Sequence, residues 1–430
     1  MSKKILVVGA SGYIASRLIP VLLEEGHSVR CLARDPRKLA RRAWIDQVEV
    51  VQADVTRKES LPPALDGCEV IYYLVHNMSA GKEYDRLDQI SAKNLGSTAA
   101  EAGVGKIIYL GGLADREDEK LAPHLYSRLE TGDILRESGI PVIEFRSGII
   151  IGSGSVSFEM IRALADQFPF LVGPLWLRHK TQPAATSDVV ARLVDALDIR
   201  DGVSLTTDLG SDEVFTYIQI MLEYARLSGK KRLSLLLPFI PPQLMAYLIS
   251  MLTPVSYAYA LPLVQGLKND SLVQYPLPAE HFPRASYLSY RQGLELAMAE
   301  TTPQGSGKPW QDSGRAAAMG LYSGLAVDYK LFPRSAAPSA VRLAEDWEEE
   351  WLGKGWKELN QSQMDDFYLG EYDHQELGKL WLEVKSITLD DEPIWERTIC
   401  LRPAGVSGYL VYYLYRWLQR FRQDKSQQLF

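Results

Sequence analysis

The stretch from Lys4 to Ala15, KILVVGASGYIA, decides the fold of this chain. Its uninterrupted apolar run, Ile5–Val8, is typical of a strand that is buried on both faces of a parallel sheet. Gly9 permits a tight turn after the strand, Gly12 leaves the backbone open to a pyrophosphate, and Ala15 lets a helix pack closely. Because the backbone N–H groups and the positive dipole end of a helix attract phosphates, the stretch predicts a dinucleotide-binding strand–turn–helix.

Short β-rich segments alternate with helical segments over the first half of the chain. The expected strands are Lys4–Gly9, Ser28–Arg34, Val48–Asp54, Val70–His76, Lys106–Gly112 and Pro141–Ser147. Helices are expected at Gly12–Glu25, Tyr84–Ala102, Leu125–Ser138, Ser187–Leu197 and Thr216–Ser228. This alternation predicts an α/β fold with a doubly wound parallel Rossmann sheet.

Length, charge and cysteine content exclude several classes of protein. A chain of 430 residues is too long for one ordinary domain. Its net charge of −7 argues against an obligatory nucleic-acid partner. Cys31, Cys68 and Cys400 form no CxxC or metal-ligand pattern, so we expect free thiols in a reducing compartment and no metal site. Since the chain opens on a strand and not on a signal peptide, a cytoplasmic protein is expected.

Composition divides the chain into three expected regions. Residues 1–232 form the Rossmann domain, residues 233–300 a helical, apolar substrate-side region, and residues 301–430 a smaller α+β segment. Prolines interrupt the apolar segment Leu233–Val264, so it does not read as a membrane span. We expect short helices there that cover a pocket, and insertion into a membrane surface is the alternative.

The C-terminal segment begins after a boundary of Thr, Pro, Gly and Ser at Thr301–Lys308. Two strands, Leu377–Thr388 and Ile394–Leu401, are expected to pair through an acidic turn. The helix expected at Gly405–Phe421 combines aromatic and basic residues, so it either lies across a sheet or contacts a membrane interface or a partner.

The end of the second strand indicates which dinucleotide is bound. An NAD site usually has an acidic residue there, which binds the ribose hydroxyls. Here the strand ends in Arg34, with Arg37 and Lys38 close behind, and guanidinium groups suit a 2′-phosphate. Asp35 is the alternative contact to the ribose. The pattern favours NADP(H) over NAD(H).

The expected cofactor contacts all follow strands of the sheet. Asp54 and Val55 end the third strand beside the adenine, whereas the inner half of the cofactor meets the ends of the fourth and fifth strands. The expected cofactor-binding residues are Gly9, Ser11, Gly12, Tyr13, Ile14, Arg34, Asp54, Val55, Leu74, Val75 and Gly111.

Several of these segments together resemble a known family. The matching segments are Gly9–Ala15, Leu32–Pro36, Ala53–Val55, Tyr73–Met78, His124–Glu130, Arg146–Gly152, Gln182-Pro183 and Thr253–Val255. They resemble the NmrA-like branch of atypical, extended-type short-chain dehydrogenases/reductases over roughly residues 1–300. The resemblance implies a Rossmann domain with a substrate region built from later segments. Some relatives carry a START-like C-terminal segment, and residues 377–425 are weakly similar to its end.

The catalytic residues of that superfamily are incomplete in this chain. Working members use a Tyr-x-x-x-Lys pair, in which the lysine lowers the pKa of the tyrosine. Here Tyr126 is followed by Glu130, whose carboxylate would raise that pKa, and Gly111-Gly112 replaces the serine of the fifth strand. His76, at the end of the fourth strand, lies where such a sheet binds its ligand. His76 and Tyr126 are therefore the catalytic candidates.

Other polar residues are open to two interpretations. Asn94 resembles the asparagine that the superfamily carries on the corresponding helix, where it is structural as often as catalytic. Arg146, Arg178, His179 and Lys180 either bind a carboxylate or enolate or are simply solvated. His76 itself either donates a hydrogen bond near the nicotinamide or bonds to neighbouring backbone.

Two functions fit these patterns. The first is an NADP(H)-dependent reductase that acts on an apolar carbonyl or quinone-like compound by hydride transfer. The second is a non-catalytic NAD(P)-binding sensor or regulatory module of the NmrA-like kind. A weaker third hypothesis is peripheral membrane contact through residues 233–264 and 405–423. An enclosed pocket at the nicotinamide end would favour the reductase.

Overall fold

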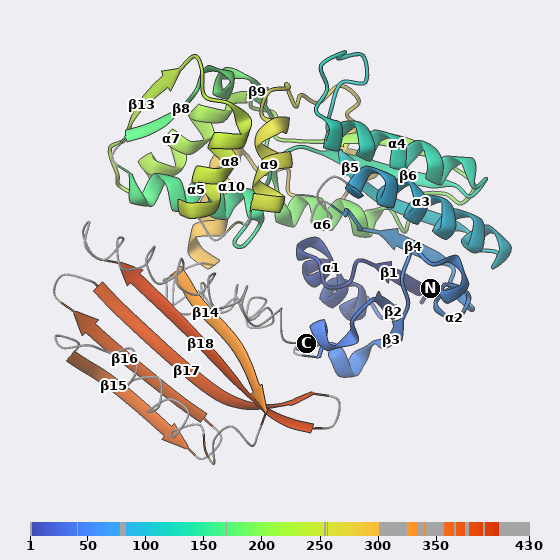
Figure 1. Ribbon diagram of the computed structural model, residues 1–430. Coiled ribbons are helices and arrows are strands. Elements are labelled where there is room, and N and C mark those ends of the chain that lie inside the picture. Colours follow the sequence, from blue (N-terminus) through green and yellow to red (C-terminus); the bar gives the residue numbers. More distant parts are fainter. Residues whose placement is uncertain are drawn as a thin grey trace. The chain divides into compact units, whose positions relative to one another are not determined.

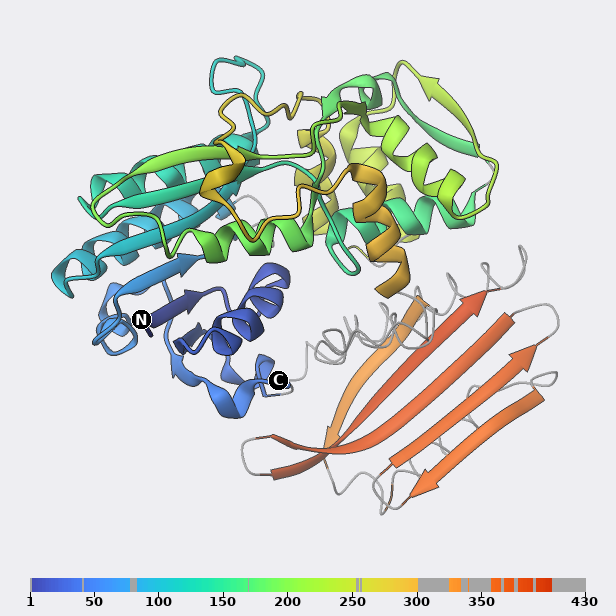
Figure 2. The same ribbon diagram turned by 180° about the vertical axis from the view of Figure 1, so that it is seen from behind.

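Two compact units make up the chain, and the first is formed by residues 1–39 and 43–298. Figure 1 and Figure 2 show the computed structural model from opposite sides. The structure describes residues 2–40, 42–77, 83–168, 170–252, 255, 257–300, 325–333, 339, 357–364, 367–374, 378–389 and 392–403.

A parallel sheet forms the centre of the first unit. Its order in the described part of the chain is β11-β6-β5-β4-β1-β2-β3, with every neighbouring pair parallel. The doubly wound Rossmann fold is confirmed, and β11 adds an edge strand that the sequence pattern did not indicate. The strands are β1 (Lys4–Val8), β2 (Ser28–Ala33), β3 (Glu49–Gln52), β4 (Val70–Tyr73), β5 (Lys106–Gly112), β6 (Val142–Ser147) and β11 (Leu205–Leu209).

Helices cover both faces of this sheet (Figures 1 and 2). Alternate residues of β1 explain why: Ile5 and Val7 pack into one core with α1 and α6, whereas Leu6 and Val8 pack into another with α2, α3 and α4. An apolar run without alternation is therefore buried on both sides. The helices are α1 (Tyr13–Glu24), α2 (Pro62–Leu65), α3 (Tyr84–Glu101), α4 (Pro123–Glu137) and α6 (Thr186–Asp195).

A second group of elements lies beyond the carboxyl ends of the central strands (Figure 1). One hydrophobic core joins α5, α7 and α10, and a smaller one joins α5 to α8 and α9. This group consists of α5 (Val156–Gln167), α7 (Tyr217–Leu227), α8 (Pro242–Leu252), α9 (Tyr257–Gly266), α10 (Tyr290–Glu300), and the short strands β7 (Ile150–Ile151), β8 (Phe170–Pro174), β9 (Lys180–Thr181), β10 (Ala184–Ala185), β12 (Phe215–Thr216) and β13 (Leu233–Leu237).

The segment 233–264 differs in part from the expectation of short helices. Helices α8 and α9 are present, but Leu233–Leu237 is the strand β13, which pairs in parallel with β8. The expectation was wrong for these five residues because consecutive leucines fit a strand or a helix equally well, and only pairing with β8 decides. No helix of the described residues is long and apolar enough to cross a membrane.

The second unit contains an antiparallel sheet of order β14-β18-β17-β16-β15 among its described residues. The expected pairing of two C-terminal strands is confirmed by β17 and β18. The expected helix at 405–421 lies outside the described residues. The strands are β14 (Leu325–Pro333), β15 (Lys357–Met364), β16 (Phe367–His374), β17 (Gly378–Leu389) and β18 (Glu392–Pro403).

Candidate active site

The turn between β1 and α1 has the geometry that a dinucleotide phosphate requires. Gly9 has a φ of +92°, and a Cβ atom there would lie 2.8 Å from the carbonyl oxygen of Leu74. Gly12 is the N-cap of α1, makes no side-chain capping hydrogen bond and is followed by no acidic residue in the first turn. The positive end of α1 is thus neither capped by a side chain nor neutralised by one, which fits a pyrophosphate.

The other expected cofactor residues lie at neighbouring strand ends. Asp54 accepts hydrogen bonds from the backbone N–H and the hydroxyl of Thr56, and the carbonyl of Val55 accepts one from Asn94. The helix asparagine therefore fixes the loop after β3. Because β3, β2, β1, β4 and β5 are consecutive in the sheet, the residues that follow or end them share its carboxyl edge.

Tyr13 and Ile14 have packing partners of their own at the start of α1. The Tyr13 hydroxyl lies 3.0 Å from the hydroxyl oxygen of Thr186 at the start of α6, and Ile14 packs against the core between α1 and the sheet. These two side chains therefore hold the turn in place, while its backbone remains the part that faces a phosphate.

At the end of β2, the acidic alternative already has a cationic partner. The Asp35 carboxylate accepts a hydrogen bond of 2.7 Å from Nε of Arg37, and this guanidinium lowers the pKa of Asp35. The Arg34 guanidinium is exposed and makes no ion pair with the residues that the structure describes. Charge at this strand end therefore suits a phosphate better than a pair of hydroxyls.

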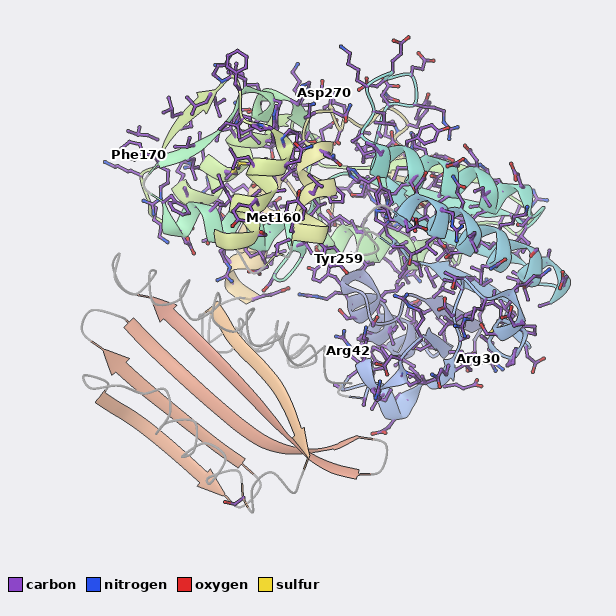
Figure 3. The ribbon with its side chains drawn as sticks, viewed as in Figure 1. Arg30, Arg42, Met160, Phe170, Tyr259 and Asp270 are labelled. Atoms are coloured by element: carbon purple, nitrogen blue, oxygen red, sulfur yellow. The ribbon has the colours of Figure 1, made fainter. Side chains whose placement is uncertain are left out.

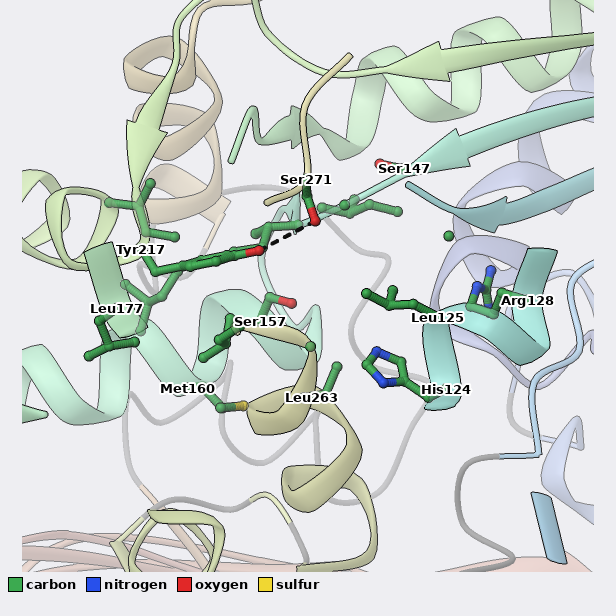
Figure 4. Close-up of a pocket in the computed structure, with 18 of the residues that line it drawn as sticks. His124, Leu125, Arg128, Ser147, Ser157, Met160, Leu177, Tyr217, Leu263 and Ser271 are labelled. Carbon is green, nitrogen blue, oxygen red and sulfur yellow. Dashed lines mark hydrogen bonds between the residues drawn. The ribbon is translucent and has the colours of Figure 1, made fainter. Parts of the chain in front are cut away.

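A cavity of about 250 Å³ begins at the same edge of the sheet and extends beneath the second group of helices (Figure 4). His76, Gly111 and Gly112 border it at the sheet, and most of the other side chains are apolar. Those from the helical group and the segment before it are Ile149, Ile150, Met160, Ile161, Leu164, Leu177, Ile220, Met221, Met245, Ile249, Leu263 and Leu267.

A buried hydrogen-bonded network orients His76 at the cavity. Its Nδ1 lies 2.8 Å from Oδ2 of Asp88, whose Oδ1 accepts hydrogen bonds of 2.9 Å from both the backbone and the side-chain nitrogen of Asn77. The Ser127 hydroxyl donates to the same carboxylate over 3.2 Å. Nε2 of His76 is buried without a partner among the described residues. An ionised Asp88 therefore holds the proton on Nδ1 and leaves Nε2 for a ligand.

His124 and Arg128 add a neutral and a charged group to the same end of the cavity (Figure 4). Burial lowers the pKa of His124 to about 3, and burial also lowers that of His76 despite the opposing effect of Asp88. The guanidinium of Arg128 donates to the carbonyl of Leu110, and a Cβ atom on Gly112 would lie 3.0 Å from Cδ of Arg128. Arg128 thus takes the space beside Gly112 that a serine side chain would enter.

Hydroxyl groups border the cavity at its other end. The Tyr217 hydroxyl lies 3.3 Å from Oγ of Ser271 and also donates to the backbone carbonyl of Asn269. Figure 4 shows Tyr217 and Ser271 next to each other, on the opposite side of the cavity from His124 and Arg128. The cavity therefore offers polar groups at two ends of an apolar interior, which is how small-molecule sites fix orientation.

The structure separates the two catalytic candidates. His76 lines the cavity, whereas the side chain of Tyr126 is 58% exposed and does not line it. The carboxylate of Glu130 accepts a hydrogen bond from Gln89 over 2.8 Å. A tyrosine on α4 is therefore present in sequence but turned towards solvent.

All four cations considered for a substrate anion lie outside the cavity lining. Arg146 is buried in an ion pair with Asp208 at 2.7 Å, and His179 pairs with Asp270 at 2.9 Å. Lys180 is exposed. Arg178 is likewise exposed and absent from the lining. The cation that does border the cavity is Arg128.

Asp88 and Ser271 were not identified from the sequence. Asp88 lies on α3, 12 residues after His76, and its carboxylate was one of several in that helix. The available signal was the helical spacing that places the acidic Asp88 on the same face of α3 as the apolar Ala92 and Leu95. Ser271 lies in a loop, where no periodicity marks a side chain as inward-facing.

Comparison with known proteins decides the family. Residues 1–276 match the model of the NmrA-like family. The chain belongs to this family. The NmrA-like chain is 30% identical over 148 residues to the photosystem II assembly factor Ycf39 of Cyanophora paradoxa. The matched region covers 33% of this chain and 44% of the assembly factor. It is 27% identical over 156 residues to anthocyanidin reductase of Arabidopsis thaliana, covering 34% of this chain and 44% of the reductase. The NmrA-like chain thus spans less than half the length of these relatives.

Solved structures agree with the Rossmann fold of the NmrA-like chain. A nucleoside-diphosphate-sugar epimerase from Staphylococcus aureus has a TM-score of 0.52 at 16% identity and covers 69% of this chain and 100% of its own. The UDP-glucose 4-epimerase of Thermotoga maritima has a TM-score of 0.50 at 15% identity, with coverage of 68% and 97%. At such identity the likeness concerns the fold alone. The comparisons thus show an NmrA-like chain with a Rossmann fold.

Proposed function

We propose that this chain binds NADP(H) at the carboxyl edge of the sheet and reduces an apolar carbonyl or quinone-like acceptor in the adjoining cavity. The observation that carries the proposal is the cavity itself, which is apolar along most of its length and begins at Gly111 and Gly112. These glycines end β5, which neighbours β4 in the sheet, where the nicotinamide half of a dinucleotide would lie.

The residues present fit such a cofactor. The turn at Gly9 and Gly12 leaves the start of α1 open for the pyrophosphate, and Arg34 offers a guanidinium for a 2′-phosphate. Asp54, Val55, Leu74 and Val75 would lie along the rest of the molecule. When bound, NADPH supplies a hydride.

The remaining chemistry belongs to side chains of the cavity. His76 borders the cavity, and its Nε2, which has no partner among the described residues, would transfer a proton to or from a substrate oxygen while Asp88 fixes the ring through Nδ1. Arg128 and the neutral His124 provide hydrogen-bond donors beside it. The apolar walls exclude water, which strengthens each of these polar contacts.

A conjugated acceptor suits this set of residues. Reduction of a quinone or enone needs less help from a protein acid than oxidation of an alcohol, because the developing charge is delocalised. At the other end of the cavity the hydroxyl oxygens of Tyr217 and Ser271, whose protons are donated to the carbonyls of Asn269 and Leu113, would accept a hydrogen bond from a hydroxyl group of the reduced product. Residues 233–300, which include α8 and α9, would then form the substrate-side region. A cytoplasmic location, peripheral membrane contact and a START-like C-terminal segment stay predictions.

Calorimetric titration with NADPH and NADH, on the wild type and on Arg34→Ala, tests the cofactor. We expect NADPH to bind more tightly and the variant to lose roughly tenfold to a hundredfold in NADPH affinity with little change for NADH, because one charge-assisted contact is removed. The matched control is Arg116→Ala, which removes a guanidinium from the loop between β5 and α4. No binding of either dinucleotide contradicts the proposal.

A turnover screen with quinones and enones then tests the reaction. Turnover that falls in His76→Gln but not in Tyr126→Phe supports the reductase and its proton-transfer residue. Binding without turnover of any acceptor favours the second candidate, a sensor of cofactor state. The replacement of the usual lysine and serine by Glu130 and Gly112 is the observation that speaks for that candidate.

A further inference from the structure

Residues 233–267 contain no charged side chain and no histidine, although much of this segment lies at the protein surface. Basic residues flank the segment on both sides: Lys230, Lys231 and Arg232 precede it, and Lys268 follows it. An uncharged segment of this length is common inside a protein but unusual at its surface, where charged residues normally prevent association.

Apart from Ser234, which pairs with Leu171 on the inner face, the ribbon of β8 and β13 is apolar on both of its faces. Leu171 and Leu236 face inward and pack into the core around α5 and α7. On the outer face, Leu233 pairs with Phe170, and these side chains are 67% and 57% exposed. Figure 3 shows Phe170 at the outer side of the ribbon. A strand with one solvated face normally alternates apolar and polar residues, so this outer face is built for contact with something apolar.

Exposed apolar side chains continue along the chain from β13 into α8. Phe239, between β13 and α8, is 92% exposed. In α8, Leu244, Tyr247 and Leu248 are exposed, whereas Met245 and Ile249 line the cavity. The helix is thus apolar towards both the cavity and the solvent. We call the outer faces of the β8–β13 ribbon and α8, together with Phe239, the apolar surface.

We propose that the apolar surface docks on a lipid bilayer that contains anionic headgroups. Three observations favour a membrane over a protein partner. No acidic residue interrupts the segment, its flanking cations suit phosphate headgroups, and aromatic residues lie among the exposed side chains. Because only the outer faces of these elements would contact the lipid, docking is peripheral and shallow.

The three cations that precede β13 have two different roles: two hold the strand in place and one is exposed. Lys231 is exposed, whereas Nζ of Lys230 lies 2.7 Å from Oδ1 of Asp166, and Nε of Arg232 donates to the carbonyl of Ala165 over 2.8 Å. The two tethered side chains fix the start of β13 to the end of α5. Lys231 remains available for a lipid phosphate.

Docking of this surface would supply the cavity with lipid-soluble molecules. The inner side of α8, at Met245 and Ile249, lines the cavity, so a bilayer on its outer side is separated from the cavity by one helix. The acceptor would then be a membrane-dissolved molecule such as a long-chain quinone. This last step rests on the proposed function, whereas the docking itself does not.

Flotation of the full chain with lipid vesicles tests the docking without any activity readout. The vesicles are phosphatidylcholine alone and phosphatidylcholine mixed with phosphatidylglycerol. Leu235, on the outer face of the ribbon, is 54% exposed. We expect binding to the mixed vesicles, and a loss of roughly tenfold or more in Leu235→Asp and in Phe239→Asp, because the native side chains would be buried in the lipid. Val214→Asp changes an exposed apolar residue outside the surface and should bind like the wild type.

A charge variant tests the electrostatic contribution to vesicle binding separately from the apolar contribution. Lys231→Glu should weaken binding to the mixed vesicles several-fold, whereas Lys120→Glu, at an exposed site in another loop, should not. Thermal melting of every variant shows that each is folded. The proposal is overturned if the wild type floats with neither vesicle, or if the Asp variants at Leu235 and Phe239 bind like Val214→Asp. It is equally overturned if the wild type forms a lipid-independent dimer that these variants abolish.

Discussion

Nδ1 of His76 lies 2.8 Å from Oδ2 of Asp88, and this contact joins the end of β4 to the first half of α3. The pair is buried, and the carboxylate receives three further hydrogen bonds from Asn77 and Ser127. The imidazole is therefore held in one orientation and one tautomer, in a residue that borders the cavity. Tyr126 is turned to solvent and does not line the cavity, so it cannot act there. The histidine–carboxylate pair is the candidate that borders the cavity.

Removal of the Asp88 charge should affect both stability and turnover. We expect Asp88→Asn to lower the free energy of unfolding by about 3 kcal/mol, because buried hydrogen bonds to a charged acceptor are lost. Turnover with an acceptor from the screen should fall about a hundredfold, as proton-transfer residues typically contribute that much. Urea unfolding and steady-state kinetics measure the two effects. Asp85→Asn, at an exposed position of the same helix, is the control, and equal behaviour of the two variants would refute the role of Asp88.

The direction of the His76 pKa shift predicts the pH dependence of reduction. Burial lowers this pKa below 6.5, so at neutral pH Nε2 carries no proton, while Asp88 opposes the shift and Arg128 reinforces it. The protonated fraction rises only as the pH falls below 6.5. The kcat/KM for reduction should therefore increase between pH 7 and pH 5.5 for an acceptor that needs a proton. A profile that is flat in this range, in both wild type and His76→Gln, would contradict proton transfer by His76.

His124 should make the fold sensitive to acid. Its pKa is about 3 in the folded chain and 6.5 when unfolded, so the unfolded state binds more protons between these values. Stability is complete above pH 6.5 and is lost as the pH falls towards 3, by about 1.4 kcal/mol per pH unit for this residue. Urea unfolding between pH 7.5 and pH 5 gives the free energy of unfolding as a function of pH. This free energy should fall less steeply with decreasing pH in His124→Gln than in the wild type. His281→Gln, at an exposed site, should leave the slope unchanged; identical slopes in all three proteins would disprove the assignment.

A comparison of two glycines isolates the steric requirement of the phosphate turn. Gly9 and Gly26 both have positive φ angles, but a Cβ atom on Gly9 would lie 2.8 Å from the Leu74 oxygen, whereas one on Gly26 has no atom within 4 Å. Gly26→Ala should cost about 1 kcal/mol for the backbone conformation alone. Gly9→Ala should cost about 2–4 kcal/mol and abolish dinucleotide binding, because overpacking adds to the same backbone cost. Equal losses in unfolding and titration experiments would show that the contact with Leu74 is unimportant.

The Asp35–Arg37 pair should influence cofactor choice. In Arg37→Ala the Asp35 carboxylate loses its 2.7 Å partner and becomes available to a ribose hydroxyl. We expect NADH affinity to rise about fivefold relative to NADPH, which corresponds to one net hydrogen bond of about 1 kcal/mol. Calorimetric titration gives the ratio. Arg116→Ala breaks a comparable pair with Asp133 in the loop after β5. A changed NADH-to-NADPH affinity ratio in that variant too would point to a general charge effect.

Much of the architecture could be read from the residues alone. The runs of β1 and β4 are apolar without alternation, which occurs when a strand is covered on both faces, and their helices begin and end within one or two residues of the expected positions. The turn at Gly9 was recognised because a positive φ and a close backbone contact leave few other residue types. Leu233–Leu237 was harder, because four leucines and one serine have no distinguishing period and only β8 provides a pairing partner.

The sequence by itself determined the Rossmann fold, the phosphate turn and the missing Lys and Ser of the superfamily, because these depend on local conformation and on residue identity. Tertiary structure decided which side chains meet at the cavity. It turned Tyr126 outward, brought Asp88 to His76, placed Arg128 beside Gly112 and set Tyr217 against Ser271. The physical reason is that contacts between distant segments depend on helix rotation and on packing between elements, and one residue type suits many such environments.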